Sequence, residues 1–530
     1  MMREMKCRRI LETDFLKLDK DNTSVYFVDY SETYFTELHE QYPWILDRLK
    51  GILTNTTDRV NGSVTKGSKG ICVLGREVPI LPYESVLELD AHAFFIILSD
   101  YSMETYAKVD EISARSHRAI PNLFYYPNEA TRIQLDFREK LQGYPLEKMI
   151  VFRSGPHESQ CVDGMDFDDN AKALFEYMLG EGYDNKWHLV WLVKDATKYA
   201  GKYSNHPNVE FIPYHWAGSA NELERDKYYH VLFLSKFLFF TDAYGFARNC
   251  RPDQIRVQLW HGCGFKTRIN FSRCEKRYEY NIVISKVYQE IHERIYGLRR
   301  DQVLITGYPK EDWLFTPCMD WRERFGIPYA CKYLFWMPTF RKASEALSEL
   351  NEAGFTGETG LPILHTVKEL MTLNQMLRER DTVLLLKLHP FQKRAEIKVP
   401  ALSNIYVIEN ADLIREGLNI NQILGNADAL ISDYSSTAVD YLILNRPMAF
   451  TLEDLETYED SRGFVFENVR EWFPGMEIWN KEDFLEFVMQ IAEGRDPYEA
   501  KRNRIRNKMH DFSDGHSCRR LLEKLGIENL

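Results

Sequence analysis

The sequence lacks the cysteine patterns of a metal-bound or disulfide-bonded fold and the long apolar runs of a membrane protein. Its nine cysteines lie singly between Cys7 and Cys518, without a C-x-x-C pair and with an odd total, so neither a zinc ribbon nor a disulfide framework is supported. The strongest apolar runs, Ala93–Leu98 and Val231–Phe240, are much shorter than the roughly 20 residues that a membrane-spanning helix needs. The charged segment Met1–Arg9 is not followed by the apolar stretch of a secretory signal. We therefore expect a cytoplasmic protein, with any membrane contact peripheral and at the inner face of the cell membrane.

A surplus of positive charge is also absent. The formal net charge is -12 at pH 7, whereas proteins that coat nucleic acid carry an excess of lysine and arginine. The composition therefore argues against nucleic acid as a partner. It still allows a local basic cleft that binds a phosphate ligand.

The glycine-rich dinucleotide signature is missing from the N-terminal region, although the pattern of strands and helices there is Rossmann-like. Apolar runs predict strands at Ser24–Tyr30, Gly51–Thr54 and Phe94–Ser99, with a helix at Glu32–Tyr42. The turn after the first strand reads Asp29-Tyr30-Ser31-Glu32, without the glycines that let a backbone approach a pyrophosphate. We expect residues 1–145 to form a small Rossmann-like α/β domain with a structural or docking role.

Two further series of alternating strands and helices follow, as the length of 530 residues allows. Breaks at Gly143–Pro145 and Arg324–Pro328 place the expected domains at 146–325 and 326–530. The expected strands are Met149–Phe152, His188–Val193, Val209–Ile212, Phe237–Thr241, Ile255–Trp260, Ile282–Ser285 and Val303–Thr306, then Tyr333–Met337, Val383–Leu388, Ile405–Ile408, Ala429–Ser432 and Met448–Phe450. Two parallel-sheet domains in tandem predict a ligand cleft between them.

Five short polar segments each follow the carboxyl end of a predicted strand. They are Trp260-His261-Gly262, Gly307-Tyr308-Pro309-Lys310, Met337-Pro338-Thr339-Phe340-Arg341, Lys387-Leu388-His389-Pro390 and Asp433-Tyr434-Ser435-Ser436. In open α/β sheets these strand ends converge on the ligand crevice. The five segments are therefore the candidate site.

The last of these segments has the features of a phosphate-binding site. Ser435 and Ser436 open an apparent helix, where free backbone N–H groups and the helix dipole favour an anion. Asp440 lies one turn further along the same face, where it would order the serines or bind a ligand hydroxyl. The alternatives are an ordinary helix cap for the serines and a surface carboxylate for Asp440.

Two histidines and an arginine in the other segments have side chains suited to the chemistry of phosphates. His261 is able to remove a proton from a hydroxyl near neutral pH, and Gly262 lets a ligand approach. His389 follows Lys387 on one strand face, where the pair would suit a diphosphate. Arg341 offers bidentate donors to phosphate. A structural role for either histidine and a surface position for Arg341 remain open.

The acidic run Asp163–Asp169 precedes a predicted helix at Asn170–Leu179. It lacks the spacing of an EF-hand loop, and carboxylates are favoured in the first turn of a helix. We interpret the run as helix capping, and it predicts no metal site.

Taken together, the ordered segments resemble the CDP-glycerol glycerophosphotransferases of teichoic acid and related capsule polymer synthesis. The stretches that carry the resemblance are Trp260–Lys266 (WHGCGFK), Gly307–Lys310 (GYPK), Pro338–Arg341 (PTFR), Lys387–Pro390 (KLHP) and Ser432–Tyr441 (SDYSSTAVDY). The resemblance spans about Met149 to Leu522 and implies a GT-B fold, with the donor held mainly by the second Rossmann-like half.

This resemblance implies transfer of glycerol phosphate, or secondly ribitol phosphate, from CDP-glycerol or CDP-ribitol to a hydroxyl of a polymer or lipid-linked glycan acceptor. CMP is released, and no tightly bound cofactor or metal is expected. His261 would be the general base and His389 a second catalytic residue. The implied substrate-binding residues are Gly262, Cys263, Gly264, Phe265, Lys266, Lys310, Pro338, Thr339, Arg341, Lys387, Leu388, Asp433, Ser435, Ser436 and Asp440. The alternatives are a GT-B glycosyltransferase that uses a nucleotide sugar and a non-enzymatic assembly protein with a degenerate site.

One stretch departs from the family pattern. The family's T-P-L after the first His-Gly is Cys263-Gly264-Phe265 here, beside the expected acceptor and polyol end. The departure leaves the identity of the transferred group open. A nucleophilic role for the Cys263 thiol is not expected, because no partner base is visible in the sequence.

Overall fold

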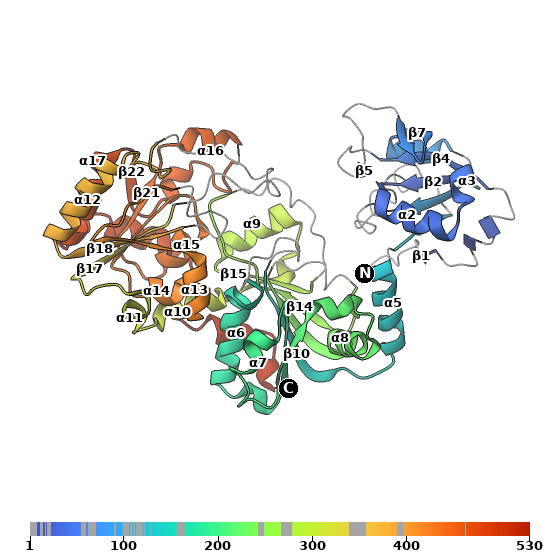
Figure 1. Cartoon of the computed structure of the whole chain (residues 1–530), viewed down its shortest axis with the longest axis horizontal. Helices are drawn as coiled ribbons and strands as arrows, with labels where there is room; N and C mark the ends of the chain where they lie inside the picture. Colours follow the sequence, from blue (N-terminus) through green and yellow to red (C-terminus); the bar gives the residue numbers. More distant parts are fainter. Residues whose placement is uncertain are drawn as a thin grey trace. The chain divides into compact units, whose positions relative to one another are not determined.

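The computed structural model describes most of the chain as two compact units. The described residues are all except 1–7, 11–13, 16, 19–22, 55–59, 62–69, 90–91, 99–104, 106–108, 110–111, 113–119, 121, 128, 156–164, 242–248, 267–277, 339–356, 389–396, 462 and 530. The first unit comprises Met1–Gly143 with Ala217–Tyr229, and the second comprises Tyr144–Trp216 with His230–Leu530. Figure 1 shows the elements of each unit.

The first unit contains a seven-stranded sheet in the order β1-β9-β8-β2-β4-β7-β6. All strand pairs in this sheet are parallel except the β6–β7 hairpin. Its elements are β1 (Arg8–Arg9), β2 (Val25–Val28), β3 (Tyr30–Ser31), α2 (Glu32–Gln41), α3 (Ile45–Arg48), β4 (Leu49–Leu53), β5 (Val60–Asn61), β6 (Gly70–Val73), β7 (Arg76–Leu81), β8 (Phe94–Ile97), β9 (Leu123–Tyr125) and α5 (Glu129–Leu141). Asp29, just past β2, is buried, and its carboxylate accepts hydrogen bonds of 2.5 Å from Tyr83 Oη and Thr105 Oγ1. The side chain at this strand end therefore belongs to the polar core of the unit.

The N-terminal half of the second unit is built on an all-parallel sheet in the order β12-β11-β10-β13-β14-β15-β16. The strand residues are mostly buried, and the central ones are mostly apolar, as expected when helices cover both faces of a sheet. The elements are β10 (Glu147–Arg153), α6 (Asp169–Gly180), β11 (His188–Val193), α7 (Thr197–Ala200), β12 (Val209–Pro213), α8 (Glu222–Leu234, shared with the first unit), β13 (Ser235–Phe240), β14 (Ile255–Gln258), β15 (Tyr280–Val283), α9 (Lys286–Tyr296), β16 (Val303–Ile305), α10 (Asp312–Phe315) and α11 (Trp321–Phe325).

The C-terminal half repeats this architecture with the strand order β19-β18-β17-β20-β21-β22, again all parallel. Its elements are β17 (Lys332–Trp336), α12 (Val367–Glu379), β18 (Thr382–Lys387), β19 (Ile405–Ile408), α13 (Asn410–Glu416), α14 (Ile420–Leu424), β20 (Ala429–Ser432), α15 (Ser436–Leu442), β21 (Met448–Thr451), α16 (Leu455–Ser461), β22 (Met476–Ile478), α17 (Lys481–Ala492), α18 (Glu499–Met509) and α19 (Ser517–Lys524).

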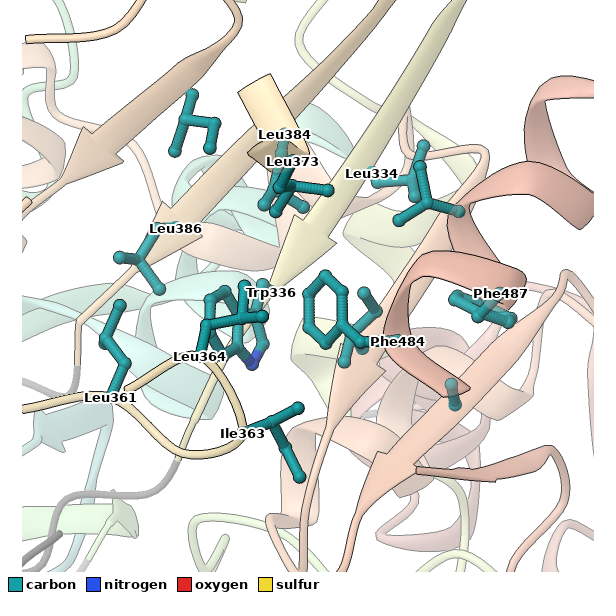
Figure 2. Packing of buried hydrophobic residues seen from close by; sticks show 14 of the residues in the cluster. Leu334, Trp336, Leu361, Ile363, Leu364, Leu373, Leu384, Leu386, Phe484 and Phe487 are labelled. Atoms are coloured by element: carbon teal, nitrogen blue, oxygen red, sulfur yellow. The ribbon is translucent and has the colours of Figure 1, made fainter. Parts of the chain in front are cut away.

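One face of this C-terminal sheet forms a core with α12 and α17. Alternate strand residues such as Leu334 and Trp336 point to this face, in keeping with the two-residue period of a strand. Trp336 meets Phe484 of α17 edge to face, with ring centroids 4.9 Å apart, and Leu373 of α12 belongs to the same cluster (Figure 2). This packing fixes β17, β18 and β20, whose carboxyl ends carry three of the candidate segments.

The C-terminal tail returns to the N-terminal half. The backbone N–H of Asp511 donates to Ile284 O over 3.1 Å. The carboxylate of Asp312 accepts hydrogen bonds from the N–H groups of Ser517 and Cys518, at 2.8 and 2.9 Å, and so satisfies donors at the start of α19. The tail thus connects the two halves of the second unit.

The structure tests two of the expectations at the level of the fold. The predicted α/β class, with two Rossmann-like domains preceded by a smaller one, is confirmed. Within the part of the chain that the structure describes, no helix is long and apolar enough to cross a membrane.

Candidate functional site

The loop that follows β14 holds His261 in a fixed position. Trp260 adopts a left-handed conformation (φ 57°), and its N–H donates to Gln258 Oε1 over 2.9 Å. The buried amide of Asn170 donates to Trp260 O over 2.8 Å. These bonds compensate a backbone conformation that is rare for a large side chain, and they turn the next residue out of the sheet.

His261 forms a pair with Asp169, at the start of α6. The distance from His261 Nδ1 to Asp169 Oδ2 is 2.8 Å, and the two side chains are 31% and 23% exposed. Burial alone would raise the pKa of the Asp169 carboxyl, but the Lys310 ammonium, and then the hydrogen bond and charge of His261, outweigh it, so this pKa lies below its ordinary value. An ionised Asp169 keeps the proton of the imidazole on Nδ1. The other ring nitrogen, Nε2, then carries no proton and has the lone pair that a general base needs.

The interpretation of the acidic run as helix capping holds for one of its last two residues, since Asp169, in the first turn of α6, accepts a hydrogen bond of 2.9 Å from the backbone N–H of Asn170 to its Oδ1. Asp168 is at the N-cap of α6, but its side chain makes no cap bond and instead accepts from Asn419 Nδ2 over 2.9 Å. Asp169 has a left-handed backbone (φ 62°) and directs Oδ2 to His261. Both carboxylates thus also bind partners that are distant in the sequence, at separations of 251 residues for Asp168 and 92 residues for Asp169. Asp163, at the start of the run, lies outside the described residues.

Lys310 lies between carboxylates from both halves of the unit. Its Nζ is 3.5 Å from Asp169 Oδ1 and 3.3 Å from Asp440 Oδ2, and it donates to the backbone carbonyl of His261. The lysine side chain is 12% exposed and that of Asp440 is 2% exposed. Burial would lower the pKa of Lys310, but the two carboxylates raise it above its ordinary value. The lysine therefore stays charged and cross-links the site.

Asn170 is a second site residue that sequence reasoning missed. Besides holding Trp260 O, its side-chain oxygen accepts from the backbone N–H of Lys310 over 3.1 Å. One buried amide thus fixes both the His261 loop and the Lys310 loop. A weak signal was present in the sequence, because Asp169 and Asn170 lie after a predicted strand, as the five polar segments do.

Asp440 is buried in an environment that disfavours its charged form. Burial raises its pKa to about 6, although Lys310 acts in the opposite direction. Asp440 Oδ1 is buried with no hydrogen-bond partner among the residues that the structure describes. The alternative of a surface carboxylate is therefore wrong for Asp440, which is buried beside Lys310.

The serine turn meets the glycines of the His261 loop. Ser435 caps α15 through a bond of 3.3 Å from the N–H of Thr437 to its Oγ. A Cβ on Gly262 (φ 157°) would lie 3.3 Å from Ser436 Cβ, and one on Gly264 would lie 3.4 Å from it. The helix cap, which was the alternative for the serines, is thus seen at Ser435, and Ser436 lies beside the His261 loop.

Cys263 has none of the features of a nucleophile. Its thiol is 2% exposed and lies 3.2 Å from Tyr308 Oη. Burial raises the pKa of Cys263 far above its ordinary value, so the thiol stays protonated.

Phe265 and Lys266 lie on an aromatic cluster of the C-terminal half. Phe265 is fully buried, and its ring contacts those of Phe450 and Phe473, with centroids 6.1 and 5.2 Å away. Lys266 forms an isolated antiparallel bridge with Phe464, and its Nζ lies 5.3 Å from the ring centroid of Tyr458. Phe265 therefore packs in the core, while Lys266 is held at its edge.

The remaining candidate residues divide into buried and undescribed ones. Pro338, Leu388 and Asp433 are buried. Lys387 is buried too, with Nζ donating to Leu388 O over 2.6 Å, and burial lowers its pKa to about 8, although Asp168 raises it. His389, Thr339 and Arg341 lie outside the described residues. Within the described part of the chain, no group of three or more His, Cys, Asp or Glu side chains is arranged to hold a metal ion.

A buried pair behind the site contributes to stability. His510 Nε2–H donates to Val439 O over 2.9 Å, and His510 Nδ1 lies 3.9 Å from Glu311 Oε1. Burial lowers the pKa of His510 to about 4 and raises that of Glu311 well above its ordinary value. Both shifts favour the neutral form of the group.

We expect replacement of His510 with glutamine to make the protein less sensitive to acid. The folded pKa of about 4 lies below the ordinary 6.5, so the unfolded chain binds the extra proton between these values. Stability is therefore lost as pH falls through this window, by up to about 3 kcal/mol. His510→Gln keeps a donor for Val439 O but removes the titration. Urea unfolding at pH 7 and pH 4.5 should show a smaller loss for the variant, and an equal loss in both proteins would contradict the assignment.

Comparisons with known proteins agree with the geometry. A teichoic acid glycerol-phosphate transferase of Staphylococcus aureus is 25% identical over 421 residues, which are 73% of this chain and 94% of that protein. A teichoic acid glycerol-phosphate primase of Bacillus subtilis is 26% identical over 395 residues, covering 70% of this chain and 92% of that one.

A solved structure gives the fold. The wall teichoic acid polymerase TagF superposes with a TM-score of 0.56 at 19% identity, covering 80% of this chain and 97% of that one. The predicted GT-B-like pair of halves is thereby confirmed. The family profile of CDP-Glycerol:Poly(glycerophosphate) glycerophosphotransferase matches residues 148–526, which include both halves and all five polar segments. The chain therefore belongs to the CDP-glycerol:poly(glycerophosphate) glycerophosphotransferase family.

Proposed function

We propose that the protein transfers glycerol phosphate, or secondly ribitol phosphate, from its CDP derivative to a hydroxyl of a cell-surface polymer or lipid-linked glycan. The pairing of His261 with Asp169 beside the Ser435–Ser436 turn carries the proposal. It brings a candidate base next to a helix start that is suited to a phosphate. Family membership supplies the class of donor.

In the proposed reaction the acceptor hydroxyl attacks the β-phosphorus of the CDP-polyol. His261 Nε2 takes the hydroxyl proton, and Asp169 stabilises the imidazolium that forms. A new phosphoester bond forms to the acceptor oxygen. The bond between the β-phosphorus and the bridging oxygen breaks, and CMP leaves with that oxygen.

The donor is proposed to lie against the C-terminal half. Ser435, Ser436 and the N–H groups of the helix start would bind its phosphates. His389 and Arg341 are proposed to stabilise the charge on the diphosphate, as the family motifs imply. Lys310 is proposed to hold the site together without binding the donor, because its three contacts are with protein groups. Positioning and electrostatics suffice in this mechanism, so a tightly bound metal is not part of the proposal.

The acceptor sets the expected location of the protein. A lipid-linked glycan acceptor would bring it to the inner face of the cell membrane, and this contact is proposed to be peripheral.

The test is a panel of donors incubated with purified protein and a hydroxyl acceptor. Release of CMP from CDP-glycerol or CDP-ribitol is the expected result. Turnover of nucleotide sugars alone would contradict the proposal and would favour a glycosyltransferase of the same fold. An absence of any turnover, with normal polymer synthesis in cells carrying His261→Ala, would favour an assembly role.

A further inference from the structure

A groove of about 870 Å³ lies on the C-terminal half, outside the residues that carry the proposed chemistry. It is formed by α16, the short 3-10 helix η11 (Val469–Trp472), β22 and α18. Leu455, Val469 and Ile505 provide buried apolar residues at its floor. Four basic residues line its walls, namely Arg470, Lys501, Arg504 and Lys508.

Three of these cations lie in a row on one helix. Lys501, Arg504 and Lys508 lie on α18 at spacings of three and four residues, which place them along one face of the helix. None of the three forms an ion pair with any residue that the structure describes. Three glutamates also line the groove. Glu477 is paired with Arg470 at 2.6 Å, and the other two are Glu459 and Glu471. A chain with a net charge of -12 thus keeps a stripe of unpaired cations in one groove.

The cations are crowded and lie beside indole rings. Burial lowers the pKa of Lys501, and Arg504 and Arg470 lower it further, against Glu477. Lys508 Nζ lies 5.6 Å from the Trp472 ring centroid, and the Arg470 guanidinium lies 5.3 Å from that of Trp479. Crowded cations repel one another, so an anion in the groove would relieve this repulsion.

The groove is linked to the site through packed rings. Trp472 stacks on Phe466 with centroids 4.1 Å apart, and Phe466 lies 6.3 Å from Phe265, in the loop that carries His261. Helix α18, which lines the groove, also packs against α9 of the N-terminal half and against α15, which begins at Ser436. The groove therefore borders the elements that hold the acceptor and donor residues of the proposed reaction.

We propose that this groove binds the phosphodiester backbone of the acceptor polymer. The inference rests on the proposed function, and it applies to an acceptor polymer that is itself a chain of polyol phosphates. Such a chain carries one negative charge per repeat, so a row of unpaired cations along a helix binds several repeats at once. The polyol carbons would lie on the apolar floor and against the indole rings. Binding there would retain the growing chain while its end reacts at His261.

The test measures binding without any donor, by fluorescence anisotropy of labelled poly(glycerol phosphate) at about 0.1 M salt. Arg504→Glu/Lys508→Glu should weaken binding at least about 10-fold and reduce its salt dependence. The matched control is Lys368→Glu/Arg378→Glu, which changes the same charge at exposed positions of α12 and should change affinity less than about twofold. Turnover with CDP-glycerol and a short acceptor should be unchanged in both double variants.

Several outcomes would overturn the proposal. Equal losses in the two double variants would mean that only overall charge matters. Wild-type protein that binds vesicles of anionic phospholipid through Arg504 and Lys508, but not the free chain, would assign the groove to a membrane. Because no donor is present, failure of the transfer reaction would contradict the proposed function alone, and the binding result would still decide the role of the groove.

Discussion

Replacing His261 with alanine is expected to lower turnover of the CDP-polyol at least about 100-fold, because the hydroxyl nucleophile loses its general base. The proposed donor contacts lie mainly on the other half of the unit, so the affinity for the CDP-polyol should be retained. Asp169→Asn should also lower turnover, by at least about 10-fold, because an amide no longer fixes the imidazole proton on Nδ1. Steady-state kinetics with donor binding measured separately would distinguish the two effects.

A second histidine provides a matched control for this experiment. His206 Nδ1 lies 2.9 Å from Asp184 Oδ2, and the His206 side chain is 36% exposed, close to the 31% of His261. His206→Ala removes a similar pair from the same half of the unit but lies outside the candidate segments. It should leave turnover unchanged. If His261→Ala kept activity within about threefold of wild type, His261 would not be the base.

Replacing Lys310 with methionine is expected to give the largest loss of stability. The substitution removes the cation between Asp169 and Asp440, so that Asp440 loses its ion-pair partner in a buried region and Asp169 keeps only its pairing with His261. Breaking a buried ion pair in this way costs about 3–5 kcal/mol. The cost should be smaller below pH 5, where protonation of these carboxylates relieves the repulsion. Urea or thermal unfolding measures both effects.

The control for this variant is a lysine in an exposed pair. Lys332 Nζ lies 3.0 Å from Asp428 Oδ1, with side chains 36% and 30% exposed, so Lys332→Met should cost less than about 1 kcal/mol. Adding Asp440→Asn to Lys310→Met should recover part of the lost stability, since the buried charge that had lost its partner disappears. Equal costs for the two single lysine variants would show that Lys310 is not an electrostatic cross-link.

The strands of the second unit could be predicted because they are continuous apolar runs between polar turns. β11, β19 and β20 have the bounds that the sequence predicts. The three-residue strands β9 and β22 were not predicted, because so short a segment takes its conformation from the strand beside it. The grouping of Ala217–Tyr229 with the first unit was also not predictable from local patterns.

The candidate site, like the fold, could be predicted only in part from local sequence patterns. Strand-end position alone was sufficient to bring His261, Lys310 and Ser436 together. Asp169 and Asn170 were missed because a carboxylate and an amide at a helix start have a satisfactory local explanation. Their actual partners are 92 and 140 residues away and depend on how the loops fold back. Phe265 lies where the sequence departs from the family motif, and it packs into a core that its sequence neighbours do not reveal.

The most direct test of the account follows the β-phosphorus of the donor. CDP-glycerol labelled at this phosphorus would be incubated with the protein and a hydroxyl acceptor, and the nucleotide product would be identified together with the position of the label. The account predicts that CMP is released in equal amount to a new phosphodiester that carries the label on the acceptor. Release of CDP, with the label still on the nucleotide, would show cleavage of a carbon–oxygen bond and would contradict transfer of a polyol phosphate.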